Sequence, residues 1–101
     1  MKYGLSETEL KFILDQVVKP LKATGSKVYL FGSRANGKYK KFSDVDLLYI
    51  FESNQPAPLS LISQVTVKIE ESDFPYKVDL VSDVELADSY RTSVNADKIE
   101  L

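Results

Sequence analysis

The first part of the chain shows the spacing of an amphipathic helix. Apolar residues recur three and four positions apart, which places them on one face of a helix. They are Leu10, Ile13, Leu14, Val17 and Leu21. The preceding "SETE" fits a capping box, in which Ser6 and Glu9 side chains bind free backbone amides at a helix start. The pattern therefore predicts a helix from about Glu7 to Lys19, since Pro20 disfavours its continuation.

Three short segments rich in β-branched, aromatic and aliphatic residues predict strands. They are "KVYLF" from Lys27 to Phe31, "VDLLYIF" from Val45 to Phe51 and "YKVDLV" from Tyr76 to Val81. Between the first two, Gly32 to Gly37 predicts a turn that leads into a short helical segment, with Gly37 as its C-cap.

Two more helices are predicted in the second half of the chain. The first follows the loop-forming, proline-containing "ESNQPAP" and has apolar residues at helical spacing. These are Leu59, Ile62, Val65 and Ile69. The second begins at "SDVE", Ser82 to Glu85, which offers another capping box. Its predicted buried stripe is Val84, Ala87, Tyr90 and Val94, and the final "NADKIEL" has no clear period.

The alternation of helices and strands predicts an α/β fold, with one small mixed sheet flanked by helices. At 101 residues, the chain is long enough for one modest core, so we expect a single domain over residues 1–101. We therefore expect any second substrate-binding domain to be another chain. No apolar run approaches the ~20 residues of a membrane-spanning helix, and no leader pattern is present, so a cytoplasmic protein is expected.

The amino-acid composition limits the kinds of catalysis and metal binding that the chain can support. The chain has no Cys and no His, which excludes disulfides, thiolate nucleophiles, Ser-His triads and the usual transition-metal ligand sets. Carboxylates, hydroxyls, Lys and Arg remain, and these suit magnesium and phosphate. With 13 Lys+Arg and 15 Asp+Glu, the net charge of −2 gives no overall attraction to nucleic acid or to an anionic membrane.

A Gly-Ser pair follows the first predicted strand. Gly32 and Ser33 can form a tight turn and nothing more. Alternatively, Gly32 lets the backbone approach a phosphate while the Ser33 hydroxyl and neighbouring amides donate hydrogen bonds to it. The pair alone does not separate these interpretations.

Acidic residues enter two of the predicted strands. Asp44 and Asp46 are two positions apart, so their side chains leave the same face, within reach of one cation. A solvated strand entrance explains Asp44 equally well, but Asp46 lies inside an apolar run where an unpaired charge is costly. Asp79 lies inside "YKVDLV", where it makes either a salt bridge, to Arg34 or Lys77, or a third metal ligand. Three crowded carboxylates repel each other unless metal ions hold them ionised.

A run of positive charge lies between the Gly-Ser pair and the aspartates. Such a run is usually a solvated loop. Its members are Arg34, Lys38, Lys40 and Lys41. If the turn holds a triphosphate, Arg34 is the one close enough in sequence to contact it.

Taken together, these residues resemble the signature of the DNA polymerase β-like nucleotidyltransferase superfamily. The signature is Gly32-Ser33, ten intervening residues, Asp44-Val45-Asp46 and a third acidic residue, Asp79, in a later strand. Within the superfamily the chain is similar to the minimal nucleotidyltransferases, or MNT proteins, although many members have a second Arg where this chain has Asn36.

The resemblance implies the roles of the residues. Gly32 and Ser33, with Arg34, would bind the phosphates of ATP, and Asp44, Asp46 and Asp79 would be catalytic and would ligate two Mg²⁺ ions. MNT proteins are typically encoded beside a small helical HEPN protein. The resemblance therefore implies an antitoxin that forms a hetero-oligomer with a HEPN toxin and transfers AMP to a tyrosine hydroxyl of it, with no direct role for nucleic acid or membrane.

Two rival functions remain open at this stage. One is a non-catalytic antitoxin that neutralises its toxin by binding alone. The other is a nucleotidyltransferase of the aminoglycoside-modifying type, although such enzymes generally have an extra helical acceptor domain. The base preference, the acceptor residue and the number of AMP units transferred are not determined by the sequence.

Overall fold

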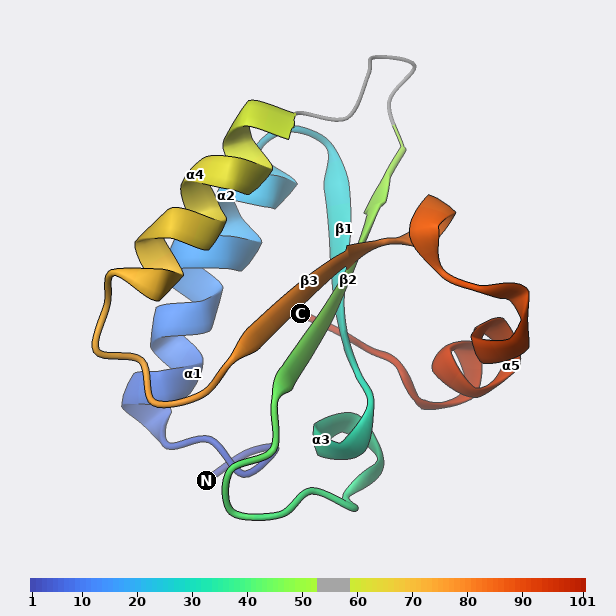
Figure 1. Ribbon diagram of the computed structural model, residues 1–101, viewed down its shortest axis with the longest axis horizontal. Coiled ribbons are helices and arrows are strands. Elements are labelled where there is room, and N and C mark those ends of the chain that lie inside the picture. The colour runs from blue at the N-terminus through green and yellow to red at the C-terminus, as the bar shows by residue number, and fades with distance from the viewer. Residues whose placement is uncertain (53–58) are drawn as a thin grey trace.

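A mixed β-sheet forms the centre of the computed structural model, which describes residues 1–52 and 59–101 (Figure 1). Within these residues the sheet has four strands in the order β3-β2-β1-β4. The strands are β1 Ser26–Phe31, β2 Val45–Phe51, β3 Val78–Ser82 and β4 Ile99–Glu100. The helical elements are α1 Glu7–Ile13, η1 Leu14–Val18, α2 Lys19–Lys22, α3 Ser33–Asn36, α4 Leu59–Glu70, η2 Asp83–Glu85 and α5 Asp88–Asp97. The predicted α/β class is confirmed.

Strand directions bring three segments to one edge of the sheet. β1 and β2 are antiparallel, so the end of β1 lies beside the start of β2. β3 is parallel to β2 and therefore starts at the same edge. The residues that follow β1 and those that open β2 and β3 consequently meet, although they are far apart in the sequence.

The first helix begins at the predicted capping box but ends later than predicted. The Ser6 amide donates to Glu9 Oε1 at 2.8 Å, and the Glu9 amide donates to Ser6 Oγ at 3.1 Å. The helical path continues to Lys22 through the π-helical turn η1, and Pro20 lies in the first turn of α2. A proline is tolerated there because the wider turn and the helix start do not need its missing amide hydrogen.

The hydrophobic core lies between the sheet and the α1, α2 and α4 helices, which are on the left in Figure 1. The predicted apolar stripe of the first helix supplies three of its fully buried side chains, Ile13, Val17 and Leu21. β1 and β2 contribute Val28, Leu30, Val45 and Leu47. Burial of such side chains is the main favourable term in folding, and here it anchors the β1 and β2 strands that lead to the acidic edge.

The segment after β3 departs from the prediction. It forms the 3₁₀ turn η2 and then α5, which begins only at Asp88. Ser82 stands at the N-cap position of η2, but its side chain makes no capping hydrogen bond. Ser82 is instead the buried last residue of β3, where it pairs with Tyr49 of β2. In consequence Val84 is 80% exposed and Tyr90 is 62% exposed, and of the predicted stripe Val94 alone is buried.

The end of the chain, which has no clear period in sequence, forms an edge strand. β4 pairs antiparallel with β1 through Tyr29 and Glu100 and through Leu30 and Ile99. The predicted loop "ESNQPAP" falls, apart from Glu52, on residues 53–58, outside the described residues. In the two described ranges, no helix is both long and apolar enough to cross a membrane.

Candidate active site

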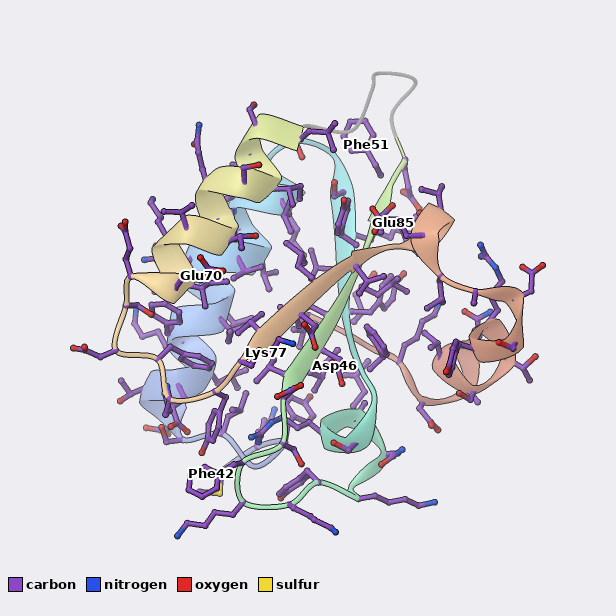
Figure 2. The ribbon with its side chains drawn as sticks, viewed as in Figure 1. Phe42, Asp46, Phe51, Glu70, Lys77 and Glu85 are labelled. Atoms are coloured by element: carbon purple, nitrogen blue, oxygen red, sulfur yellow. The ribbon has the colours of Figure 1, made fainter. Side chains whose placement is uncertain are left out.

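Two of the predicted acidic residues are direct neighbours in the sheet. Asp46, the second residue of β2, pairs with Phe31 at the end of β1 on one side and with Asp79 of β3 on the other. Gly32 and Ser33 follow Phe31 directly. Figure 2 shows Asp46 near the middle of the molecule, with Lys77 close to it. The sheet register therefore brings the Gly-Ser pair, Asp46 and Asp79 together.

The electrostatics of Asp46 indicate a crowded anionic site. Burial raises the pKa of its carboxyl group to about 6, and the charges of Asp79 and Asp44 add to the rise. A hydrogen bond with Asp79 also favours the protonated form, whereas the Lys77 charge lowers the pKa. A divalent cation would remove this repulsion and hold the carboxylates ionised. The donor set consists of hard carboxylate oxygens, so it fits Mg²⁺.

Gly32 allows the Asp46 carboxylate to lie against the start of α3. Its φ of 76° and ψ of −156° fall in a region that is essentially restricted to glycine. A Cβ at this position would also lie 2.5 Å from Asp46 Oδ2. Glycine is therefore required here for its backbone angles and for the space it leaves at the carboxylate.

Asp44 lies just before β2 and is exposed. It acts on Asp46 through its charge. Among residues 1–52 and 59–101, no three acidic side chains are arranged closely enough to hold a metal ion as they stand. The structure thus assembles the Asp46–Asp79 pair, with Asp44 beside it at the solvent.

The alternative prediction for Asp79, a salt bridge to Arg34 or Lys77, is confirmed in part, because Asp79 pairs with Lys77. Lys77 Nζ lies 3.5 Å from Asp79 Oδ1, and the two side chains are 71% and 38% exposed. Ion pairs this open to solvent contribute at most about 1 kcal/mol, and often nothing measurable. The pair with Lys77 therefore does not explain why a carboxylate faces Asp46 across two strands.

Arg34 differs from its predicted role as a phosphate contact. Its side chain is 2% exposed, and its three kinds of nitrogen all donate to backbone carbonyls. Nε and Nη2 donate to Ser43 O at 3.1 and 2.8 Å, and Nη1 donates to Tyr3 O at 3.0 Å. A guanidinium buried and engaged in this way is not free to bind a triphosphate, so Arg34 is a structural residue here.

A cavity of about 550 Å³ adjoins the Gly-Ser pair. It combines apolar walls with a few polar groups, as binding sites for organic ligands generally do. Its lining includes Gly32, Ser33, Asn36, Lys38, Val81, Leu86, Tyr90, Ser93, Val94 and Asp97. The α5 residues of this lining were not foreseen, because the sequence pattern assigned Tyr90 to a buried stripe and gave no distinctive signal for Ser93 or Asp97.

The fold and the acidic edge together define a nucleotidyltransferase domain. The sequence profile described as "Polymerase beta, Nucleotidyltransferase" matches residues 16–98. The chain therefore belongs to the polymerase beta nucleotidyltransferase family, as the resemblance implied.

Individual relatives narrow the family further. The chain is 37% identical over 84 residues to a Haemophilus influenzae protein described as "Probable protein adenylyltransferase MntA". The matched region covers 81% of this chain and 66% of that protein. A solved structure described as a minimal nucleotidyltransferase is 28% identical with a TM-score of 0.69 and covers 100% of this chain and 97% of that chain. A crystal structure of a toxin-antitoxin with AMP-PNP shares the fold at 20% identity and a TM-score of 0.57, covering 85% of this chain and 69% of that chain.

The raised pKa of Asp46 predicts a pH-dependent response to magnesium. At pH 5 the carboxyl group with a pKa of about 6 retains its proton, which competes with Mg²⁺, whereas at pH 7.5 it is ionised. Millimolar Mg²⁺ should therefore raise the melting temperature clearly at pH 7.5 and little at pH 5, which thermal unfolding followed by circular dichroism can measure. An equal rise at both pH values would show that Asp46 does not take part in metal binding.

Proposed function

We propose that residues 1–101 form a single minimal nucleotidyltransferase domain that transfers AMP from ATP, with Mg²⁺, to a hydroxyl group of a partner toxin. The observation that supports this most is the juxtaposition of Asp46 and Asp79 on adjacent strands, directly beside Gly32 and Ser33. This arrangement unites a cation-binding group with a segment that can approach phosphate.

The acidic residues would hold the metal ions. Asp46 and Asp79 provide the paired carboxylates, and Asp44, exposed beside them, would complete the ligand set. Two ions held there would stabilise both the attacking and the leaving oxygen of an in-line displacement at the α-phosphate. A bond forms between the acceptor oxygen and the α-phosphorus, the bond to the β-phosphate oxygen breaks, and pyrophosphate leaves. Asp79 lies on an edge strand and would accept a hydrogen bond from the acceptor hydroxyl, which assists loss of its proton.

The cavity beside Ser33 would hold the nucleotide. Ser33 and Gly32 would contact the β- and γ-phosphates, and Lys38 lies in the same lining. Tyr90 presents an exposed aromatic ring to this cavity, and stacking of a base on such a ring contributes about 1–3 kcal/mol.

Replacement of Tyr90 tests this placement of the nucleotide. Tyr90→Ala should weaken binding of ATP by about 5- to 100-fold, because the stacking surface is lost. The binding can be measured by titration calorimetry with Mg²⁺ and a non-hydrolysable ATP analogue. Val84→Ala, at a residue that is 80% exposed and not part of the cavity lining, is the matched control and should bind normally. Equal affinities for the wild type and Tyr90→Ala would place the base elsewhere.

We propose that the acceptor is a HEPN-type toxin and that this chain acts as its antitoxin. The proposal is supported by the 37% identity to the MntA protein and by the toxin-antitoxin whose fold it shares. A tyrosine hydroxyl of the toxin is the expected acceptor. The product of the neighbouring gene is the partner to test first.

Labelled ATP tests the transfer. The purified chain and partner are incubated with Mg²⁺ and ATP that is labelled in either the α- or the γ-phosphate. Label from the α-phosphate alone should appear on the partner, and it should be lost with Asp79→Asn. Asp73→Asn, which changes an exposed aspartate in the loop after α4, should still label the partner. A tight complex without any label would instead favour the non-catalytic antitoxin.

A further inference from the structure

Arg34 lies where three segments of the chain meet. Its Nε and Nη2 atoms both donate hydrogen bonds to the carbonyl oxygen of Ser43, at 3.1 and 2.8 Å. Through Nη1 it holds Tyr3 O at 3.0 Å. Its Cζ lies 4.3 Å from the centroid of the Tyr76 ring and 5.6 Å from that of Tyr39. One side chain of α3 thereby connects the N-terminal turn, the loop before β2 and the approach to β3.

The charge of Arg34 is buried without a carboxylate partner. The side chain is 2% exposed, and among residues 1–52 and 59–101 it forms no ion pair. A buried charge is costly unless its donors are satisfied. The hydrogen bonds to the two carbonyls and the cation–π contacts with the two tyrosine rings provide that compensation. They require the planar guanidinium group with several N–H donors, which lysine lacks.

The N-terminal turn is shaped to supply one of these carbonyls. Lys2 and Leu5 exchange both backbone hydrogen bonds, at 3.0 and 2.7 Å, around Tyr3 and Gly4. Tyr3 has a φ of 57°, which is uncommon for a non-glycine residue, and Gly4 has a φ of 72°. A Cβ on Gly4 would lie 2.5 Å from Tyr39 Cε2, the ring beside the guanidinium, and 2.7 Å from Arg34 Nη1. The turn is therefore fitted closely around the guanidinium.

The two hydrogen bonds to Ser43 O act on the peptide that introduces the acidic site. Ser43 O belongs to the peptide bond between Ser43 and Asp44, so the guanidinium holds the backbone on which the Asp44 side chain is mounted. Asp44 is exposed and lies just outside β2, and the peptide after it is held by the Val45 amide, which donates to Lys77 O at 2.8 Å. The peptide before it is the one that Arg34 holds. We propose that Arg34 is a positioning residue that sets Asp44 relative to Asp46, and so tunes the metal affinity of the acidic edge. The metal part of this inference rests on the proposed function.

The test uses three variants of the full chain. Arg34→Lys keeps the charge but cannot donate two hydrogen bonds from a planar group to Ser43 O. Tyr76→Leu removes an aromatic face but leaves these two hydrogen bonds intact, so it reports the cost of a purely structural loss. Gly4→Ala places a methyl group against both the Tyr39 ring and the guanidinium without removing either, and it provides the result if Arg34→Lys does not fold.

Two readouts separate positioning from stability. Titration calorimetry with Mg²⁺ and a non-hydrolysable ATP analogue should show metal binding weakened at least about 10-fold in Arg34→Lys and in Gly4→Ala, but by less than about 2-fold in Tyr76→Leu. Hydrogen exchange of the metal-free proteins should show faster exchange of the Ser43 amide, which donates to Lys40 O. We expect this in Arg34→Lys and Gly4→Ala but not in Tyr76→Leu.

Equal metal affinity in Arg34→Lys and the wild type, or equal losses in Arg34→Lys and Tyr76→Leu, would overturn the positioning role. If the wild type itself binds no Mg²⁺, the proposed function fails, and the exchange of the Ser43 amide still decides whether Arg34 holds the peptide before Asp44.

Discussion

Asp46→Asn is expected to abolish AMP transfer and, at the same time, to make the metal-free protein more stable at pH 7.5. The amide cannot bind Mg²⁺ as a carboxylate does, so we expect transfer to fall by more than about 10³-fold. The amide also removes a charge that repels Asp79 and Asp44. Opposite changes in activity and stability are typical of a residue that is retained for function rather than for folding.

The sign of the stability change follows from the pKa of Asp46. In the folded protein this pKa is raised from 3.8 to about 6, so the stability contributed by the protonated group is present below about pH 4 and is lost as the pH rises through about 6. Because solvent screens the half-buried carboxylate, we expect Asp46→Asn to gain about 1–2 kcal/mol at pH 7.5. In a chain of this size the melting temperature would rise by about 5–10 °C.

A matched control for this prediction is Asp15→Asn. Lys11 and Lys19 lower the pKa of Asp15 through hydrogen bonds, so its charge is favourable and its removal should slightly destabilise the protein. Transfer should be unchanged because Asp15 lies in η1 and not at the acidic edge of the sheet. If Asp46→Asn melted several degrees below the wild type without metal, Asp46 would be a structural residue.

Gly32→Ala is expected to cost about 3 kcal/mol or more of stability and to lower transfer by at least about 10²-fold. The backbone at Gly32 lies in a region that costs other residues about 1–3 kcal/mol. The added Cβ would in addition meet Asp46 Oδ2 at 2.5 Å and displace the carboxylate. Chemical denaturation and the labelled-ATP assay measure the two effects.

Gly37→Ala separates these two causes. Gly37 has a similarly positive φ of 82°, but a Cβ there would meet nothing within 4 Å. The variant should therefore lose about 1–2 kcal/mol, as expected for a residue forced into the left-handed region, and keep its transfer activity. Equal losses of activity in both glycine variants would show that backbone strain, and not contact with Asp46, determines the role of Gly32.

The sequence predicted the β2 strand and the first helix start well because their signals are local. The β2 strand has the predicted bounds, and the capping box at Ser6 and Glu9 is formed. Gly37 has the left-handed conformation predicted for a C-cap. These features depend on neighbouring residues, so propensity and spacing are sufficient to find them.

The wrong predictions concern residues whose partners are distant in the chain. Ser82 has the pattern of a helix cap, but the parallel pairing of β3 with β2 places it against Tyr49. Arg34 follows a Gly-Ser pair, but its donors reach Tyr3 and Ser43, which no local pattern indicates. Tertiary contacts decide in each case, because a buried polar group must find partners wherever the fold provides them.

Mass analysis of the partner after reaction with the wild type tests the central claim most directly. The purified chain and the product of the neighbouring gene are incubated with ATP and Mg²⁺, and the partner is analysed intact and then as peptides. We expect a gain of one or more AMP groups on a tyrosine hydroxyl, absent with Asp46→Asn and retained with Asp15→Asn. An unmodified partner after reaction with active, nucleotide-binding wild type, or one modified equally by Asp46→Asn, would contradict the assignment of the acidic edge as the site of AMP transfer.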